Sequence, residues 1–157
     1  MHYGDDWGSQ HGPLIAPDTW REFIKPRFKR MCDTAKECGL ANSLHCCGNV
    51  TELMPDIIEC GVDVFDPFQP EAMDIWELRK TYKGRIAFWG GLSVQQTLPH
   101  GTPDDIRRES RELLEKMGKD GGYVFSPSHA LTGDIPAENI RTVIEIANNQ
   151  EAIVPAR

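Results

Sequence analysis

The sequence predicts an α/β fold in which parallel βα units form about half of a (β/α)8, or TIM, barrel. Two observations support this fold class. Segments with strand and helix patterns alternate along the chain and are joined by short connections. Glycine, histidine and other polar residues gather after the strand-like segments, at the end where parallel α/β folds hold their active sites. Because a barrel unit averages about 31 residues, a chain of 157 residues corresponds to roughly half a barrel, and four βα units are predicted.

The first predicted elements are a loop, a helix and a strand. Residues 4–13 (GDDWGSQHGP) form a loop that, with the helix after it, closes an earlier unit. The helix begins near Asp18 and carries apolar residues at helical spacing. Pro26 lies inside this pattern and is expected to kink the helix or split it. The helix ends at Gly39, and residues 41–47 (ANSLHCC) are predicted to form a short buried strand.

The rest of the chain repeats this alternation. Strands are predicted over residues 62–65, 85–89 and 122–125, and helices over residues 51–60, 74–82, 102–118 and 134–149. Thr102 is suited to cap its helix, because Pro103 then occupies the first helical position. The last helix is expected to bury four apolar residues, namely Ile140, Val143, Ile144 and Ala147. Residues 1–149 thus form one domain, and residues 150–157 are expected to be a loose tail.

The composition excludes several classes of protein. A hydrophobic content of 39% with 26% charged residues is ordinary for a globular protein and argues against disorder. The net charge of −7 and the pI of about 5.2 predict that neither nucleic acid nor a membrane surface is a partner. No apolar run approaches the roughly 20 residues of a membrane span, and the start lacks a signal-peptide pattern. Five cysteines in no scaffold-like spacing indicate reduced thiols, so a cytoplasmic location is expected.

The segment LHCCG, at the end of the strand over residues 41–47, is the strongest candidate for chemistry. Side chains alternate across a strand, so His45 and Cys47 should share one face while Cys46 lies on the other and is structural. An imidazole and a thiolate on one face make a good pair of zinc ligands. The alternative is that Cys47 is a small buried apolar residue and His45 a hydrogen-bonded core histidine.

His129 follows the last predicted strand, in the segment SPSH. The carboxyl ends of barrel strands converge on one mouth, so His129 could be a third zinc ligand as well as a catalytic residue. A fourth position would then stay open for water or substrate, as in catalytic zinc sites. The alternative is a loop histidine that binds a substrate carboxylate or faces solvent.

The loop over residues 4–13 offers further candidates. Asp5 and Asp6 could act as acid and base, and the adjacent Trp7 could contact a substrate. The alternative for this segment is a solvated turn.

Two other strand ends offer substrate contacts. Gln69 and Trp89 could contact a small-molecule substrate, and Gly90 would let the backbone approach it closely. The alternative for the segment around Gln69 is a loop that its two prolines merely stiffen.

Four segments of the chain together resemble the C-terminal half of the uroporphyrinogen decarboxylase superfamily. They are GDDWGSQHGPLIAPDTWREFIKPRFKR, LHCCGNVTELMPDIIECGVDVFDPFQPEA, RIAFWGGLSVQQTLPHGTPDDIR and YVFSPSHALTGDIPAENI. The resemblance implies closed (β/α)8 barrels about twice this length. Either two copies of the chain then pair as a homodimer that closes eight strands, or a missing N-terminal half-barrel supplies the rest.

The superfamily contains two chemistries. Its decarboxylases need no cofactor, and their histidine after the last strand corresponds to His129, while their aspartate belongs to the missing half. Its cobalamin-dependent methyltransferases bind zinc through a His-x-Cys pair, matched by His45 and Cys47, and a final cysteine that His129 replaces. The resemblance favours a zinc-dependent methyltransferase that exchanges a methyl group between a small-molecule substrate or thiol and a corrinoid, which is free or on a partner protein. The alternatives are a uroporphyrinogen decarboxylase of porphyrin biosynthesis and a non-catalytic fragment.

Overall fold

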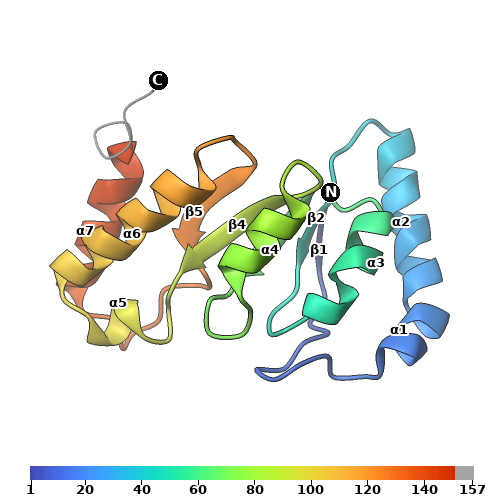
Figure 1. Cartoon of the computed structure of the whole chain (residues 1–157), viewed down its shortest axis with the longest axis horizontal. Coiled ribbons are helices and arrows are strands. Elements are labelled where there is room, and N and C mark those ends of the chain that lie inside the picture. The colour runs from blue at the N-terminus through green and yellow to red at the C-terminus, as the bar shows by residue number, and fades with distance from the viewer. Residues whose placement is uncertain (151–157) are drawn as a thin grey trace.

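The computed structural model describes residues 1–150, which form a parallel sheet of five strands with helices between them. The strands are β1 (His2–Gly4), β2 (Ser43–His45), β3 (Val64–Phe68), β4 (Ala87–Leu92) and β5 (Tyr123–Pro127). The helices are α1 (Pro17–Phe23), α2 (Lys25–Glu37), α3 (Met54–Glu59), α4 (Ile75–Tyr82), α5 (Thr97–His100), α6 (Pro103–Met117) and α7 (Ala137–Asn148), with a 3-10 turn at Thr51–Leu53. Every strand pairs in parallel with the next one along the chain, so the elements cross the molecule in sequence order (Figure 1). This is the strand order of part of a (β/α)8 barrel. The predicted tail over residues 150–157, apart from Gln150, lies outside the described residues.

Strand β1 is the main departure from the prediction of four strands. It pairs with β2 in the register His2 to Ser43 and Gly4 to His45. Three residues are too few to show an alternating pattern, so the sequence indicated only a loop here. The described part of the chain therefore contributes one strand more than half of an eight-stranded barrel.

Strands β3 and β4 both run past their predicted ends. Strand β3 continues through Pro67 to Phe68, and the pairing with β4 shifts between Phe65 and Phe68. Such a shift accommodates Pro67, which has no N–H to donate. Gly90 explains the close approach of the two strands, because a Cβ there would lie 2.8 Å from the backbone nitrogen of Phe68 and φ is +120°. Gly90 is buried and brings the two strands together, and its contact with a substrate stays a prediction.

One predicted helix boundary agrees with the structure, and one predicted apolar helix face differs from it. The first helix divides at Ile24, two residues before Pro26, as predicted. In α7, Val143 is buried as expected, but Ile144 is 52% exposed. The buried face runs instead through Asn139, Thr142, Val143 and Ile146, and Ala147 is exposed. This face is rotated from the predicted one because the Asn139 side chain donates to the carbonyls of Leu98 and Gly101, which anchors it inward.

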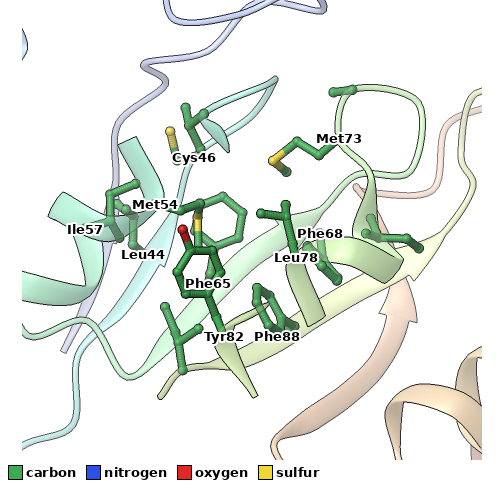
Figure 2. Packing of buried hydrophobic residues seen from close by; sticks show 14 of the residues in the cluster. Leu44, Cys46, Met54, Ile57, Phe65, Phe68, Met73, Leu78, Tyr82 and Phe88 are labelled. Carbon is green, nitrogen blue, oxygen red and sulfur yellow. The ribbon is translucent and has the colours of Figure 1, made fainter. Parts of the chain in front are cut away.

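The hydrophobic core lies between the sheet and its helices. Figure 2 shows Leu44, Phe65 and Phe88 of the strands packed with residues of the helices. The helical partners in that view are Met54, Ile57, Leu78 and Tyr82. The other face of the sheet carries exposed apolar residues, with Trp89 36% and Val124 47% exposed. None of the helices within residues 1–150 has both the length and the apolar character that a membrane span requires.

Candidate metal centre

Strand β2 (Ser43–His45) is shorter than the predicted strand over residues 41–47, so His45 is its last residue and Cys47 lies two residues beyond it, with the two side chains together. The Sγ atom of Cys47 is 3.3 Å from Nε2 of His45. Cys46 between them turns to the opposite side, where it is fully buried and its Sγ accepts a hydrogen bond from the Trp7 N–H at 3.3 Å. Strand alternation therefore separates the two adjacent cysteines, and only Cys47 lies beside the imidazole.

His129 joins this pair from the segment after β5. Its ring centroid is 5.9 Å from that of His45. One ligand atom from each of His45, Cys47 and His129 can be chosen such that all three lie within 4.8 Å of one another. Two imidazoles and one thiolate are a donor set that suits zinc and leaves a fourth tetrahedral position open. By distance and by donor chemistry, the three side chains fit a zinc ion.

Asp66, which the sequence analysis did not select, holds the imidazole of His45. Its Oδ2 lies 2.6 Å from Nδ1 of His45, and the two residues are direct partners in the register of β2 and β3. A carboxylate only accepts hydrogen bonds, so Nδ1 carries the hydrogen and Nε2 faces Cys47. A carboxylate behind a histidine is the usual support of a metal-binding imidazole. The signal in the sequence that could have identified Asp66 was its position near the end of the strand that follows β2.

The Cys47 thiol lies in electronegative surroundings. Burial, followed by the nearby carboxylates of Asp6 and Asp66, raises the pKa of Cys47 to about 11. In the metal-free protein the group is therefore a neutral thiol at physiological pH. A cation beside the sulfur would favour the thiolate, which is the form that binds metals.

Two predicted site residues shape the turn that follows β2. Oδ1 of Asp6 accepts a hydrogen bond from the Cys47 N–H at 2.8 Å, and Oε1 of Gln69 accepts one from the Gly48 N–H at 3.0 Å. Gln69 is only 6% exposed, so its carbonyl oxygen orients the turn rather than facing the predicted substrate. Asp5 donates its backbone N–H to the carbonyl of His45 at 3.0 Å, and its side chain is exposed.

The loop after β1 crosses this turn at two glycines. A Cβ on Gly48 would lie 2.5 Å from the backbone of Gly8, and one on Gly8 would lie 2.7 Å from the Cys47 carbonyl oxygen. Gly48 also has a φ of +83°. Both positions therefore need glycine, and the crossing fixes the loop that carries Asp6 against the turn that carries Cys47.

Two aromatic candidates lie in different surroundings. Trp7 is 4% exposed and packs edge-on against Trp20 and Phe28, with centroids 5.0 and 5.1 Å away. This core position differs from the predicted substrate contact, because the Trp7 backbone binds the buried Cys46 and carries the ring inward. Trp89 lies on the open face of the sheet, with its ring 6.4 Å from that of His2.

Comparison with known proteins identifies relatives across almost the whole chain. Residues 4–150 match the family described as Uroporphyrinogen decarboxylase (URO-D). A methylated-thiol–coenzyme M methyltransferase of Methanosarcina mazei is 28% identical over 136 residues, which are 87% of this chain and 34% of the relative. A methylcobamide:CoM methyltransferase of Methanosarcina barkeri is also 28% identical, over 83% of this chain and 36% of the relative. A uroporphyrinogen decarboxylase of Chlorobaculum tepidum is 24% identical, over 94% of this chain and 41% of the relative.

The solved structures give a consistent result. A methyltransferase from Methanosarcina mazei superimposes with a TM-score of 0.74 at 25% identity. The match covers 95% of this chain and 41% of that protein. The chain thus spans between about a third and two fifths of the length of the relatives it matches.

Proposed function

Because the chain belongs to the uroporphyrinogen decarboxylase (URO-D) family, we propose that it forms the metal-binding part of a zinc-dependent methyltransferase. The transferred methyl group would move between a small-molecule substrate or thiol and a corrinoid. The observation that carries this proposal is the cluster of His45, Cys47 and His129, whose ligand atoms lie within 4.8 Å of one another. The names of two relatives agree with it, since they specify a methylated thiol, methylcobamide and coenzyme M.

Under this proposal the cluster holds the metal, and the residues around it support the cluster or contact the substrate. His45, Cys47 and His129 would hold the zinc, and Asp66 keeps Nε2 of His45 free to bind. Asp6 and Gln69 keep the turn that carries Cys47 in place through its backbone N–H groups. When bound, zinc supplies a Lewis acid that lowers the pKa of a thiol or polarises a methyl donor. Trp89 and Asp5, which are exposed, would contact the small molecule.

The complete enzyme requires more than the described residues. The open sheet face beside the cluster would be covered by further strands, supplied by another half-barrel. The corrinoid would be free or carried by a partner protein. A cytoplasmic location is part of the proposal, because a reducing compartment keeps Cys47 available as a ligand.

A cofactor-free uroporphyrinogen decarboxylase is the second candidate. It is favoured by the exposed position of His129 after β5 and by the decarboxylases among the relatives. Under this alternative His129 would bind a tetrapyrrole carboxylate group, and zinc would have no role.

Zinc content of the purified chain separates the two candidates. We expect one zinc per chain by mass spectrometry after dialysis, and we expect Cys47→Ser to lose it. Cys46→Ala is the matched control, because this adjacent thiol faces the core and should leave the zinc content unchanged. A wild-type chain that takes up no zinc would contradict the methyltransferase proposal. Decarboxylation of uroporphyrinogen by metal-free protein would favour the second candidate.

A further inference from the structure

Two carboxylates of similar burial have very different partners. Asp56 has a side-chain exposure of 10% and pairs with both Lys25 and Arg21, at 2.7 and 3.0 Å. Asp66 has a side-chain exposure of 14%, and within residues 1–150 its ion-pair partner is His45 alone. A buried carboxylate is costly unless a positive charge or several donors compensate it. The cations around Asp56 explain it as a structural group, whereas Asp66 has only an imidazole.

We propose that Asp66 is a positioning residue that sets the zinc affinity of the cluster by fixing the orientation and tautomer of His45. This inference rests on the proposed function, because it concerns the same metal. Its geometric basis is the 2.6 Å contact between Oδ2 of Asp66 and Nδ1 of His45. A divalent cation bound to Nε2 of His45 would place a positive charge near the Asp66 carboxylate, which has no Lys or Arg partner within residues 1–150.

The backbone holds Asp66 in this position. His45 and Asp66 are neighbours across β2 and β3, and the Cys46 N–H donates to the Asp66 carbonyl at 2.6 Å. Both side chains therefore start from adjacent points on the same face of the sheet. With Nδ1 engaged, Nε2 points to Cys47 Sγ at 3.3 Å, where a shared ion would bind both atoms. Asp66 would thereby act on the metal without contacting it.

Metal affinity of an Asp66→Asn variant tests the inference. We expect its zinc dissociation constant, measured by competition with a chromophoric chelator, to rise about 10- to 100-fold, as for other supporting carboxylates. The matched control is Asp120→Asn, which removes the same charge from an exposed pair with Lys83 beyond the amino end of β5. The control should bind zinc like the wild type. An Asp66→Asn variant with unchanged zinc affinity would overturn the inference.

Cobalt as a spectroscopic substitute distinguishes a supporting role from direct ligation. If Asp66 only supports His45, the absorption bands of bound Co²⁺ should keep their positions in Asp66→Asn while the affinity falls. Shifted bands would mean that Asp66 is itself a ligand, which contradicts the proposal.

The tautomer of His45 can be read in the wild type, so the test does not depend on the variant folding. Nitrogen-15 chemical shifts of the metal-free chain, followed to a pH at which the ring is neutral, should show that the neutral ring keeps its hydrogen on Nδ1. A neutral ring with hydrogen on Nε2 and none on Nδ1 would refute the proposed role of Asp66. If the wild type binds no zinc, the proposed function fails, whereas zinc binding with equal affinity in Asp66→Asn removes only this inference.

Discussion

At the residue scale, the adjacent residues Cys46 and Cys47 have different roles, one in the core and one at the candidate metal site. Cys46 is fully buried, and burial raises its pKa to about 12, so it is an inert thiol. Cys47 lies 3.3 Å from Nε2 of His45. The alternation of side chains in β2 thus continues through the two residues after the strand and gives one sulfur to the core and the other to the candidate site.

Replacing Cys46 by alanine should affect stability and leave the metal site intact. We expect Cys46→Ala to lower the free energy of unfolding by about 1–3 kcal/mol, because the Trp7 N–H loses its acceptor in a buried environment. Urea denaturation measures this change, and zinc content should stay at the wild-type level. Loss of zinc in this variant would show that Cys46 is a ligand.

Replacing Gly48 by alanine should damage the crossing of the two loops. The φ of +83° and the 2.5 Å approach to Gly8 should together cost about 3 kcal/mol or more. Gly39→Ala is the matched control, because Gly39 has a φ of +72° but nothing within 4 Å of the added Cβ. It should cost only about 1–2 kcal/mol in urea denaturation. Equal losses in the two variants would mean that the crossing adds no constraint.

Some features of the site follow from local sequence and others depend on pairing between strands. The shared side of His45 and Cys47 was predictable because it needs only the two-residue period of a strand. Asp66 was not, because its contact with His45 depends on the register between β2 and β3. Trp7 was assigned to substrate because its neighbours are acidic, but the course of the backbone places its ring in the core.

At the element scale, Asp56 links α1 and α2 to α3. Its carboxylate accepts hydrogen bonds from Lys25 and Arg21 across these helices. Burial alone would raise the pKa of Asp56, but the hydrogen bonds of Lys25 and then of Arg21 outweigh it and lower the pKa below 3.8. A lowered pKa means that the folded state binds the proton less readily than the unfolded state. The ion pairs of Asp56 therefore stabilise the fold at pH values above 3.8, the pKa of the unfolded state.

This linkage predicts a loss of stability in acid. The contribution of Asp56 should be present at neutral pH and should disappear as the pH falls below 3.8 toward the lower pKa of the folded protein. Urea denaturation at a series of pH values measures it, with Asp56→Asn as the reference that lacks the titrating group. The variant should be less stable than the wild type at pH 7, and the difference should shrink in acid. A difference that does not change with pH would contradict the assignment.

Helix α6 begins with a capping box, of which the sequence predicted the Thr102 cap. The Thr102 hydroxyl accepts from the Asp105 N–H, and the Asp105 carboxylate accepts from the Thr102 N–H. We expect Thr102→Ala to lower the free energy of unfolding by about 1 kcal/mol. Thr34→Ala, at an exposed position inside α2, is the control and should be close to neutral. If both changes had the same effect, the cap would contribute nothing.

The elements differ in how much of them could be predicted, and the reason is locality. The start of α6 and the division before Pro26 depend on neighbouring residues, and both were predicted. Strand β1 is defined by hydrogen bonds to residues about 40 positions away, which no local pattern encodes. The inward face of α7 is set by the contacts of Asn139 with the carbonyls of Leu98 and Gly101, which also lie far along the chain.

At the scale of the whole molecule, the sheet has uncovered surface. Strands β1 and β5 each pair on one side only within residues 1–150. A cavity of about 400 Å³ beside β1 is lined by residues that include Tyr3 and Met31, and Met31 is 52% exposed. Unpaired edges and exposed apolar side chains favour association with further strands. Two copies of the described sheet would bring ten strands, two more than the eight that the predicted homodimer would close, so the homodimer stays a prediction.

We therefore expect the isolated chain to associate in solution. Light scattering at micromolar concentration should give a mass above the 17.7 kDa of one chain. Burial of apolar surface provides the driving force, at about 25 cal/mol per Å². A monomer that unfolds cooperatively would contradict this expectation and would show that the open sheet is stable alone.

The position of His129 has a mechanical consequence for the sheet. Strands β2 and β5 are three positions apart, which in a flat sheet separates their backbones by about 14 Å. The ring centroids of His45 and His129 are nevertheless 5.9 Å apart, because the sheet bends and both side chains reach inward. An ion bound by both histidines would cross-link the end of β2 to the segment after β5. Its binding energy would resist flattening, so metal occupancy and the curvature of the sheet would be coupled.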